Sequence, residues 1–186
     1  LVFFARVDLT KIIDLSGYIL ALFTGLTLIT LVPGLSEGGR WLDLGPLSFQ
    51  PTEGLKFGLI IWTSLALVDL GDRVKDFREG ILPFVFVMGV ISFLTLLQPD
   101  FSMTALLIST TGFLLFIGGA RLADLGKVIS LVVPLLGGLL VLEPYRLQRL
   151  ISFFGPGRDQ LETGYQLTQS LIAFGSGGIF GKGLGG

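Results

Sequence analysis

The chain alternates between long apolar runs and short polar segments, and this pattern predicts helices that cross a membrane. An apolar run of about 20 residues is what a helix needs to span the hydrocarbon core of a bilayer. A transmembrane β-barrel would alternate apolar and polar residues, and these runs do not. The sequence therefore predicts an all-α fold, a polytopic transmembrane helical bundle forming a single domain. We expect complete spans at about residues 15–32, 52–70, 81–97, 103–119 and 128–142.

Prolines and glycines mark the ends of these spans. Pro33 ends the first span, and Pro51 opens the second. A proline is tolerated there because the first N–H groups of a helix have no partner inside it. Residues 1–5 have the composition of the end of a further span, and residues 143–186 predict a long outer loop. Because both ends of the sequence fall inside such segments, we expect it to be part of a longer protein.

Composition narrows the chemistry that this chain can perform. Hydrophobic residues make up 51% of the 186 residues and charged residues 15%, whereas a soluble domain has about 25% charged residues. The net charge of −1 gives no reason to expect a nucleic-acid partner. Cysteine and histidine are both absent, which excludes disulfides, thiol chemistry, the usual zinc sites and a histidine base within these residues.

Basic residues are distributed unevenly between the two sets of connecting segments. Charged segments at residues 6–14, 72–79 and 121–127 fall on one side of the predicted bundle, whereas the opposite short turns carry a single arginine. Lysine and arginine are enriched in cytoplasmic loops. The charged segments are therefore predicted to face the cytoplasm. The segment 38–50, the turn at 98–102 and the long outer loop then share the other face.

Glu53 and Lys56 form a charged pair at the start of an apolar run. They are three residues apart, so on a helix they share a face and can pair. An ionisable group deep in a span costs about 2.5–3.5 kcal/mol on insertion scales, so such groups usually face the bundle interior or a wet cavity. The pair could therefore line a polar cavity open to the outer face. It could equally be an interfacial salt bridge, with Lys56 extending towards the headgroups.

Two outer turns hold further polar candidates. Arg40 and Trp41 could anchor their turn at the headgroup level, where tryptophan is enriched. Alternatively, the forked donors of Arg40 could contact a phosphate on a lipid substrate. Asp100 lies just before the span that starts near Met103, and its position predicts a helix N-cap.

The last part of the chain predicts a short helix followed by a glycine-rich segment. Residues 164–171 have an amphipathic pattern typical of a helix lying in the outer interface, with Gln166 and Gln169 away from its apolar side. The glycine-rich segment 174–185 could bring backbone N–H groups against a phosphate. It could equally form a flexible re-entrant loop, since it lacks a Walker A pattern.

Four motifs, in this order, carry a resemblance to a known family. They are Gly-Arg-Trp-Leu-Asp-Leu-Gly-Pro-Leu-Ser-Phe-Gln-Pro-Thr-Glu-Gly-Leu-Lys at residues 39–56, Leu-Gln-Pro-Asp-Phe at 97–101, Tyr-Arg-Leu-Gln-Arg-Leu-Ile-Ser-Phe at 145–153, and Gly-Tyr-Gln-Leu-Thr-Gln-Ser at 164–170, which continues into the glycine-rich segment. Together they resemble the SEDS family, the FtsW/RodA/SpoVE proteins of bacterial cell-wall synthesis, and lean towards its FtsW branch. The chain departs from the family at Gly54, where leucine is more typical.

The resemblance implies a multi-pass protein of ten spans in the bacterial cytoplasmic membrane. It implies a peptidoglycan glycosyltransferase that polymerises lipid II during cell division or elongation. The implied partners are the lipid II substrate, a class B penicillin-binding protein and other divisome or elongasome membrane proteins. It also places the family's catalytic aspartate beyond Gly186, so we expect residues 1–186 to be inactive by themselves.

The resemblance also assigns roles to the polar residues. Arg40, Glu53 and Lys56 are supporting candidates for the reaction. The substrate-binding candidates are Trp41, Gln50, Asp100, Arg146, Tyr165, Gln166, Gln169 and Lys182. Cationic side chains would stabilise the charge that develops on a departing pyrophosphate, assisted by a divalent cation, Mg²⁺ or Mn²⁺. No residue of this chain is predicted to bind that metal.

Two other functions remain open from the sequence. A polar cavity inside a bundle also suits a transporter that flips lipid II, because intramembrane charges are common in transporters. Spans rich in small residues pack closely against other helices, which suits a non-catalytic membrane scaffold for a penicillin-binding protein.

Overall fold

Most of the described residues are helical, and one small sheet lies between two of the helices in the sequence. The computed structural model describes residues 13–43, 45, 47–144, 147–148, 165–178, 181 and 183. The helices are α2 (Ser16–Ile29), α3 (Pro51–Leu70), η2 (Gly71–Lys75), η3 (Phe77–Ile81), α4 (Leu82–Leu97), α5 (Phe101–Ile117), α6 (Leu122–Val141) and α8 (Tyr165–Gly177), and the strands are β1 (Ser36–Glu37), β2 (Trp41–Asp43) and β3 (Ser48–Phe49). The chain divides into two compact units, Leu1–Ile129 and Ser130–Gly186.

Three helical stretches of the described chain are long and apolar enough to cross a membrane. They are Pro51–Lys75, Phe77–Leu97 and Leu122–Val141, and the apolar helices α2 and α5 are shorter. The predicted class, a polytopic helical membrane fold, is confirmed. The helices overlap the predicted spans, and their crossing of a bilayer at those bounds stays a prediction.

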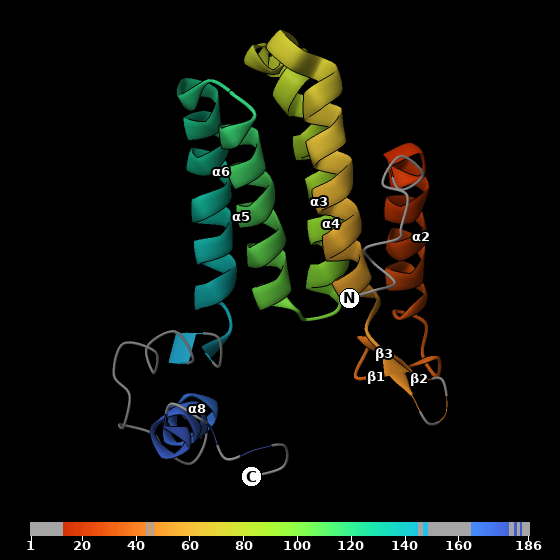
Figure 1. Cartoon of the computed structure of the whole chain (residues 1–186), viewed down its shortest axis with the longest axis vertical. Coiled ribbons are helices and arrows are strands. Elements are labelled where there is room, and N and C mark those ends of the chain that lie inside the picture. The colour runs from red at the N-terminus through yellow and green to blue at the C-terminus, as the bar shows by residue number, and fades with distance from the viewer. Residues whose placement is uncertain are drawn as a thin grey trace. The chain divides into compact units, whose positions relative to one another are not determined.

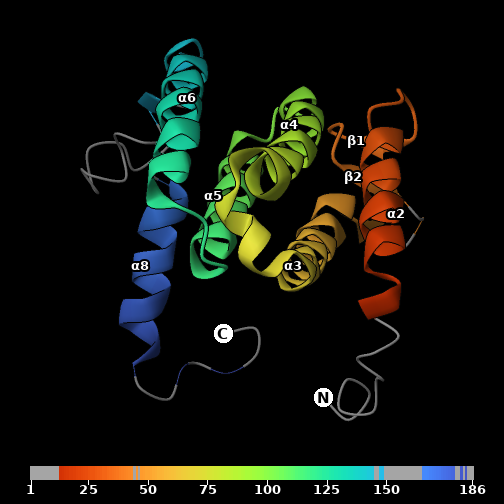
Figure 2. The same ribbon diagram turned by 90° about the horizontal axis from the view of Figure 1, so that it is seen from above.

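The helices of the first unit run alternately up and down (Figure 1). Seen along the bundle in Figure 2, α3 lies between α2 and α5, and α4 lies beside α5. One apolar cluster joins α2, α3, α4 and α5 towards the sheet, and it includes Leu20, Leu59 and Leu107. A second cluster lies towards the opposite end and includes Val74, Phe84 and Leu125. The unit therefore has a packed core along its length.

The two ends of the first unit are chemically distinct. The sheet and the turn between α4 and α5 lie at one end, which we call the outer end (Figure 1). The short helices η2 and η3 and the turn between α5 and α6 lie at the other, which we call the inner end. The charged segments 72–79 and 121–127, which were predicted to share one side of the bundle, thus both lie at the inner end. Which compartment each end faces stays a prediction.

Two glycines of α3 allow α2 to approach closely. A Cβ on Gly54 would lie 2.1 Å from the Phe23 ring, and one on Gly58 would lie 3.3 Å from the Leu20 Cα. Phe23 also packs against Phe49 of β3, with ring centroids 6.3 Å apart. The Phe23 ring thus occupies the volume that a side chain at position 54 would need. A side chain at position 54 would therefore require this ring to move.

The segment 38–50, predicted as a polar turn, contains most of a three-stranded antiparallel sheet in the order β1-β2-β3. Glu37 pairs with Trp41, and Asp43 pairs with Ser48. The chain reverses at Gly38 and Gly39, whose φ angles of 60° and 71° are costly for other residues. Strands of two or three residues are too short to produce a visible alternation, so the pattern did not predict them.

The predicted charged loop at residues 72–79 is wrong, because the segment is helical. It is made of the 3₁₀ turn η2 and the π-helical turn η3. The Asp76 carboxylate accepts hydrogen bonds from the backbone N–H groups of Arg78 and Glu79 at 2.8 and 3.0 Å. These two hydrogen bonds hold the pKa of Asp76 below its usual value, the bond from Glu79 having the larger effect. Local capping thus replaces the expected irregular loop.

The predicted loop at residues 121–127 is wrong for a similar reason. Helix α6 begins at Leu122, six residues before the expected start of the span at 128. Lys127 Nζ lies 2.6 Å from the Asp124 carboxylate, three residues earlier on the same helix. Charges spaced in this way stabilise a helix instead of ending it.

In the second unit, the predicted helix near residue 164 is confirmed as α8, from Tyr165 to Gly177. The helix continues into the segment that was predicted to be a glycine-rich turn from residue 174. Most of the predicted outer loop before α8 lies outside the described residues, as do most residues after Gly178.

Candidate functional site

The outer end brings together two segments that carry predicted site residues. Arg40 lies in the turn between β1 and β2, and its guanidinium is 4.0 Å from the Asp100 carboxylate in the α4–α5 turn. Asp100 also accepts a hydrogen bond from the Met103 N–H at 3.0 Å, which confirms the predicted N-cap of α5. The Asp100 side chain is 12% exposed and that of Arg40 is 44% exposed. The long contact leaves most guanidinium donors able to bind another anion.

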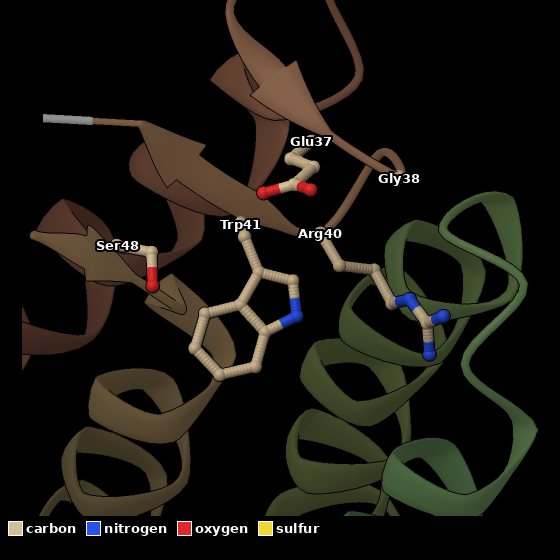
Figure 3. A pocket seen from close by; sticks show the side chains of 5 residues that line it. All are labelled: Glu37, Gly38, Arg40, Trp41 and Ser48. Carbon is tan, nitrogen blue, oxygen red and sulfur yellow. The ribbon is translucent and has the colours of Figure 1, made fainter. Parts of the chain in front are cut away.

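Arg40 and Trp41 line a pocket of about 320 Å³ together with Glu37, Gly38 and Ser48. Figure 3 shows the Trp41 indole extending from β2 to below the sheet, while the Arg40 side chain extends towards the green helical ribbons. The pocket therefore combines an aromatic face, a cation, a carboxylate and a hydroxyl. A headgroup anchor needs only the indole, whereas a ligand site would also use the polar groups beside it. Which of the two roles Arg40 and Trp41 have stays a prediction. Glu37 and Ser48 were not among the predicted candidates.

Glu53 and Lys56 form the predicted ion pair in the first turns of α3, with 2.7 Å between Lys56 Nζ and a Glu53 carboxylate oxygen. The Lys56 side chain is 24% exposed and its Nζ lies 5.8 Å from the centre of the Phe57 ring. Glu53 is favoured in the first turn because the helix N-terminus attracts negative charge. Neither residue lines the pocket below the sheet. Their place in a central cavity stays a prediction.

Gln98 is a buried polar residue of this end that was not chosen from the sequence. Its side chain is fully buried, and its Nε2 donates to the Thr27 carbonyl at 3.3 Å and to the Thr30 hydroxyl. Both threonines lie at the end of α2 and are buried. A signal was available, because Thr24, Thr27 and Thr30 recur every three residues in an otherwise apolar run. Such a stripe provides polar groups that a neighbouring helix can meet.

The remaining predicted site residues are not brought to this end by the described chain. Gln50 lies immediately before α3, at the N-cap position, and makes no side-chain cap. Tyr165 and Gln169 are exposed on α8 in the second unit. Only the backbone of Gln166 is described, and Arg146 and Lys182 lie outside the described residues. Their contribution to substrate binding stays a prediction.

The described residues assemble no metal centre. No group of three or more carboxylates among them is placed to hold an ion. The divalent cation that the family resemblance implies stays a prediction.

Comparison with known proteins identifies the family of this chain. The family described as cell cycle protein, FtsW/RodA/SpoVE, matches residues 1–186. A protein of Allochromatium vinosum named "Probable peptidoglycan glycosyltransferase FtsW" is 40% identical over 174 residues, which are 91% of this chain and 44% of that protein. A protein of the same name from Aliivibrio salmonicida is 38% identical over 97% of this chain and 46% of its own length.

A solved structure has the same fold. It comes from work described as "Structural coordination of polymerization and crosslinking by a peptidoglycan synthase complex", and it superposes with a TM-score of 0.66 at 29% identity. The match covers 95% of this chain and 53% of that chain. The chain thus spans about half the length of the proteins that it matches. It belongs to the FtsW/RodA/SpoVE family of cell cycle proteins.

Proposed function

We propose that the protein is a peptidoglycan glycosyltransferase that polymerises lipid II at the outer face of the cytoplasmic membrane during cell division. The observation that carries this proposal is the pocket at the outer end of the bundle, which Arg40 and Trp41 line and beside which Arg40 also faces Asp100. The names of the relatives support the reaction class and the branch of the family. A substrate that carries sugars, a pyrophosphate and a lipid tail suits a cationic, aromatic pocket at a membrane surface.

In the proposed reaction, a sugar hydroxyl of one lipid-linked disaccharide attacks the anomeric carbon of another. The new carbon–oxygen bond forms as the bond to the polyprenyl pyrophosphate breaks, and the pyrophosphate leaves with the bonding electrons. The hydroxyl proton passes to a general base, the aspartate that the family resemblance places beyond Gly186. In this proposal Arg40 binds a phosphate oxygen as charge develops on it. Lys56 is the second cationic candidate, held in position by Glu53.

The proposed partner is a class B penicillin-binding protein. The support is the solved structure with the same fold, which was determined in work on a complex that polymerises and crosslinks peptidoglycan. In such an assembly the glycan chain made by this protein would be crosslinked by its partner.

The test uses the full-length protein with its penicillin-binding partner in proteoliposomes containing lipid II. Arg40→Ala and Lys56→Ala should each reduce the polymerisation rate at least about tenfold, because one lost donor to a developing oxyanion costs about 10²–10³-fold in other enzymes. The matched control is Lys75→Ala, which breaks an ion pair of the same spacing at the inner end. Its rate should equal that of the unsubstituted protein.

Three outcomes would contradict the proposal or part of it. Equal rates for Arg40→Ala and the control would remove Arg40 from the mechanism. Movement of labelled lipid II across the vesicle without glycan formation would favour a flippase. A normal complex with its partner and no polymerisation by the unsubstituted protein would favour a scaffold.

A further inference from the structure

Gln98 lies where the α4–α5 turn meets the end of α2. It follows α4 and precedes Asp100 by two residues, and its fully buried amide reaches the end of α2, about seventy residues away in sequence. Its Oε1 is buried and has no partner among the described residues. A buried amide that is only partly satisfied is costly. The burial of this amide therefore needs a specific explanation.

The hydrogen bonds at this amide determine which way it faces. The Thr30 hydroxyl donates its proton to the Thr27 carbonyl at 2.8 Å, so towards Gln98 it can only accept. The Thr27 carbonyl is also an acceptor. Both partners therefore require the NH₂ group of the amide, and a side chain without a donor cannot replace it.

The same threonine connects this contact to the sheet. The Thr30 carbonyl accepts a hydrogen bond from the Ser36 hydroxyl at 2.6 Å. Ser36 opens β1 and pairs with Leu42 of β2, and Arg40 lies in the turn between these strands. Gln98 is thus joined to the base of the turn that carries Arg40.

Two contacts therefore join the α4–α5 turn to the stretch of chain that runs from the end of α2 to the β1–β2 turn. The first, between Gln98 and the end of α2, is buried, and the second, between Asp100 and Arg40, is at the surface and is 4.0 Å long. A long ion pair with one exposed partner contributes little to fixing its own geometry. The buried amide is much better suited to that task.

We propose that Gln98 is a positioning residue, whose amide clamps the α4–α5 turn to the end of α2 and thereby holds Arg40 in register with Asp100. The geometric part of this inference depends on the structure alone. Its consequence for activity rests on the proposed function, in which Arg40 binds the substrate phosphate.

The geometry is tested by distance measurements between paired nitroxide labels in the full-length protein. Residues 1–186 contain no cysteine, so labels go on introduced ones, after replacement of any cysteine elsewhere. Leu47→Cys and Ser102→Cys report on the outer end, and Glu79→Cys and Leu122→Cys report on the inner end; all four positions are exposed. Gln98→Met, which keeps the length of the side chain and removes both donors, should broaden only the outer distance distribution. An unchanged outer distribution would overturn the proposal.

The matched control is Thr111→Val. Thr111 is buried and its hydroxyl contacts Met88 Sδ at 3.1 Å, between α5 and α4. This variant also removes a buried polar contact, but it does not involve α2 or the sheet, so both distance distributions should stay unchanged. If Gln98→Met fails to fold, Thr30→Val removes one acceptor from the other side of the clamp and should give the same outer broadening.

The consequence for activity is tested by combining substitutions. Gln98→Met should lower lipid II polymerisation about tenfold in the unsubstituted background and less than about twofold when Arg40 is already alanine, because the two act through one arrangement. A purely structural residue would lower the rate by the same factor in both backgrounds, and that result would overturn the positioning role. If the unsubstituted protein fails to polymerise lipid II while the label distances respond as expected, the proposed function fails and the clamp remains.

Discussion

The two ends of the first unit hold their charges in different ways. At the inner end, Lys75 pairs with Asp72 and Lys127 pairs with Asp124, each with a residue three positions away on the same helix. At the outer end, Arg40 meets Asp100 from a different element, and a buried amide joins α2 to the α4–α5 turn. Local pairs stabilise the helices that contain them. Contacts between distant segments determine the geometry of a surface.

The Glu53–Lys56 pair shows that spacing alone does not distinguish these roles. It has the same separation of three residues as the inner-end pairs. Its lysine differs in burial, since the Lys56 side chain is 24% exposed and those of Lys75 and Lys127 are 54% and 67% exposed. A lysine held partly out of water in an apolar helix is the stronger functional candidate.

The largest expected effect on stability comes from the tightest glycines of the two ends. A Cβ on Gly80 would lie 2.5 Å from the Val74 Cα and 2.6 Å from two backbone oxygens, which cannot move away locally. Gly80→Ala should therefore lower the free energy of unfolding by about 3 kcal/mol or more, at the upper end of the range for overpacking. Gly54→Ala should cost about 1–2 kcal/mol, because the Phe23 side chain can rotate. Thermal unfolding in detergent measures both.

The control for this comparison is Gly89→Ala, which would meet nothing within 4 Å and should leave stability unchanged or slightly higher. In a Phe23→Ala background, Gly54→Ala should cost nothing further, whereas Gly80→Ala should cost as much as before. Equal costs for Gly54→Ala in both backgrounds would show that the Phe23 ring is not what opposes a side chain at position 54.

The next largest effect is expected on the polymerisation rate, when the carboxylates of Asp100 and Asp72 are substituted in turn. Asparagine is as good an N-cap as aspartate, so Asp100→Asn keeps the cap of α5 and removes the charge that faces Arg40. We expect polymerisation by the full-length protein to fall about tenfold, which corresponds to about 1.4 kcal/mol. Asp72→Asn breaks an exposed local pair and should leave the rate unchanged. Similar rates for the two variants would mean that charge at the outer end has no special role.

The smallest effect concerns the Asp76 cap at the inner end. The hydrogen bonds from Glu79 and Arg78 keep the pKa of Asp76 below its usual value of 3.8. Its contribution to stability is therefore present above that pH and is lost as the pH falls through the lower pKa of the folded protein. Asp76→Ala should slightly lower the melting temperature at pH 7, and the difference should shrink below pH 3.8. A difference that grows in acid would contradict this cap.

The sequence pattern was sufficient to predict several features of local structure. The apolar runs predicted the helices, Pro51 predicted the start of α3, and the spacing of Glu53 and Lys56 predicted their ion pair. Asp100 was correctly predicted to cap α5. Each of these depends on atoms within a few residues of one another. The regular geometry of a helix connects such residues whatever surrounds them.

The wrong predictions have two causes, which are local rules applied too narrowly and strands too short to leave a pattern. Charges at residues 121–127 suggested a loop, but Asp124 and Lys127 are spaced to pair on a helix, and α6 includes them. The sheet was missed because its strands contain only two or three residues.

Amino-acid order by itself determined the helices, their caps and the local ion pairs, because these follow from backbone geometry over one turn. Tertiary packing decided that Gln98 meets Thr30, that Arg40 lies beside Asp100, and that Phe23 takes the space left by Gly54. These contacts join residues far apart in the chain. Only the crossing of whole helices brings them within reach, and no local rule encodes where helices cross.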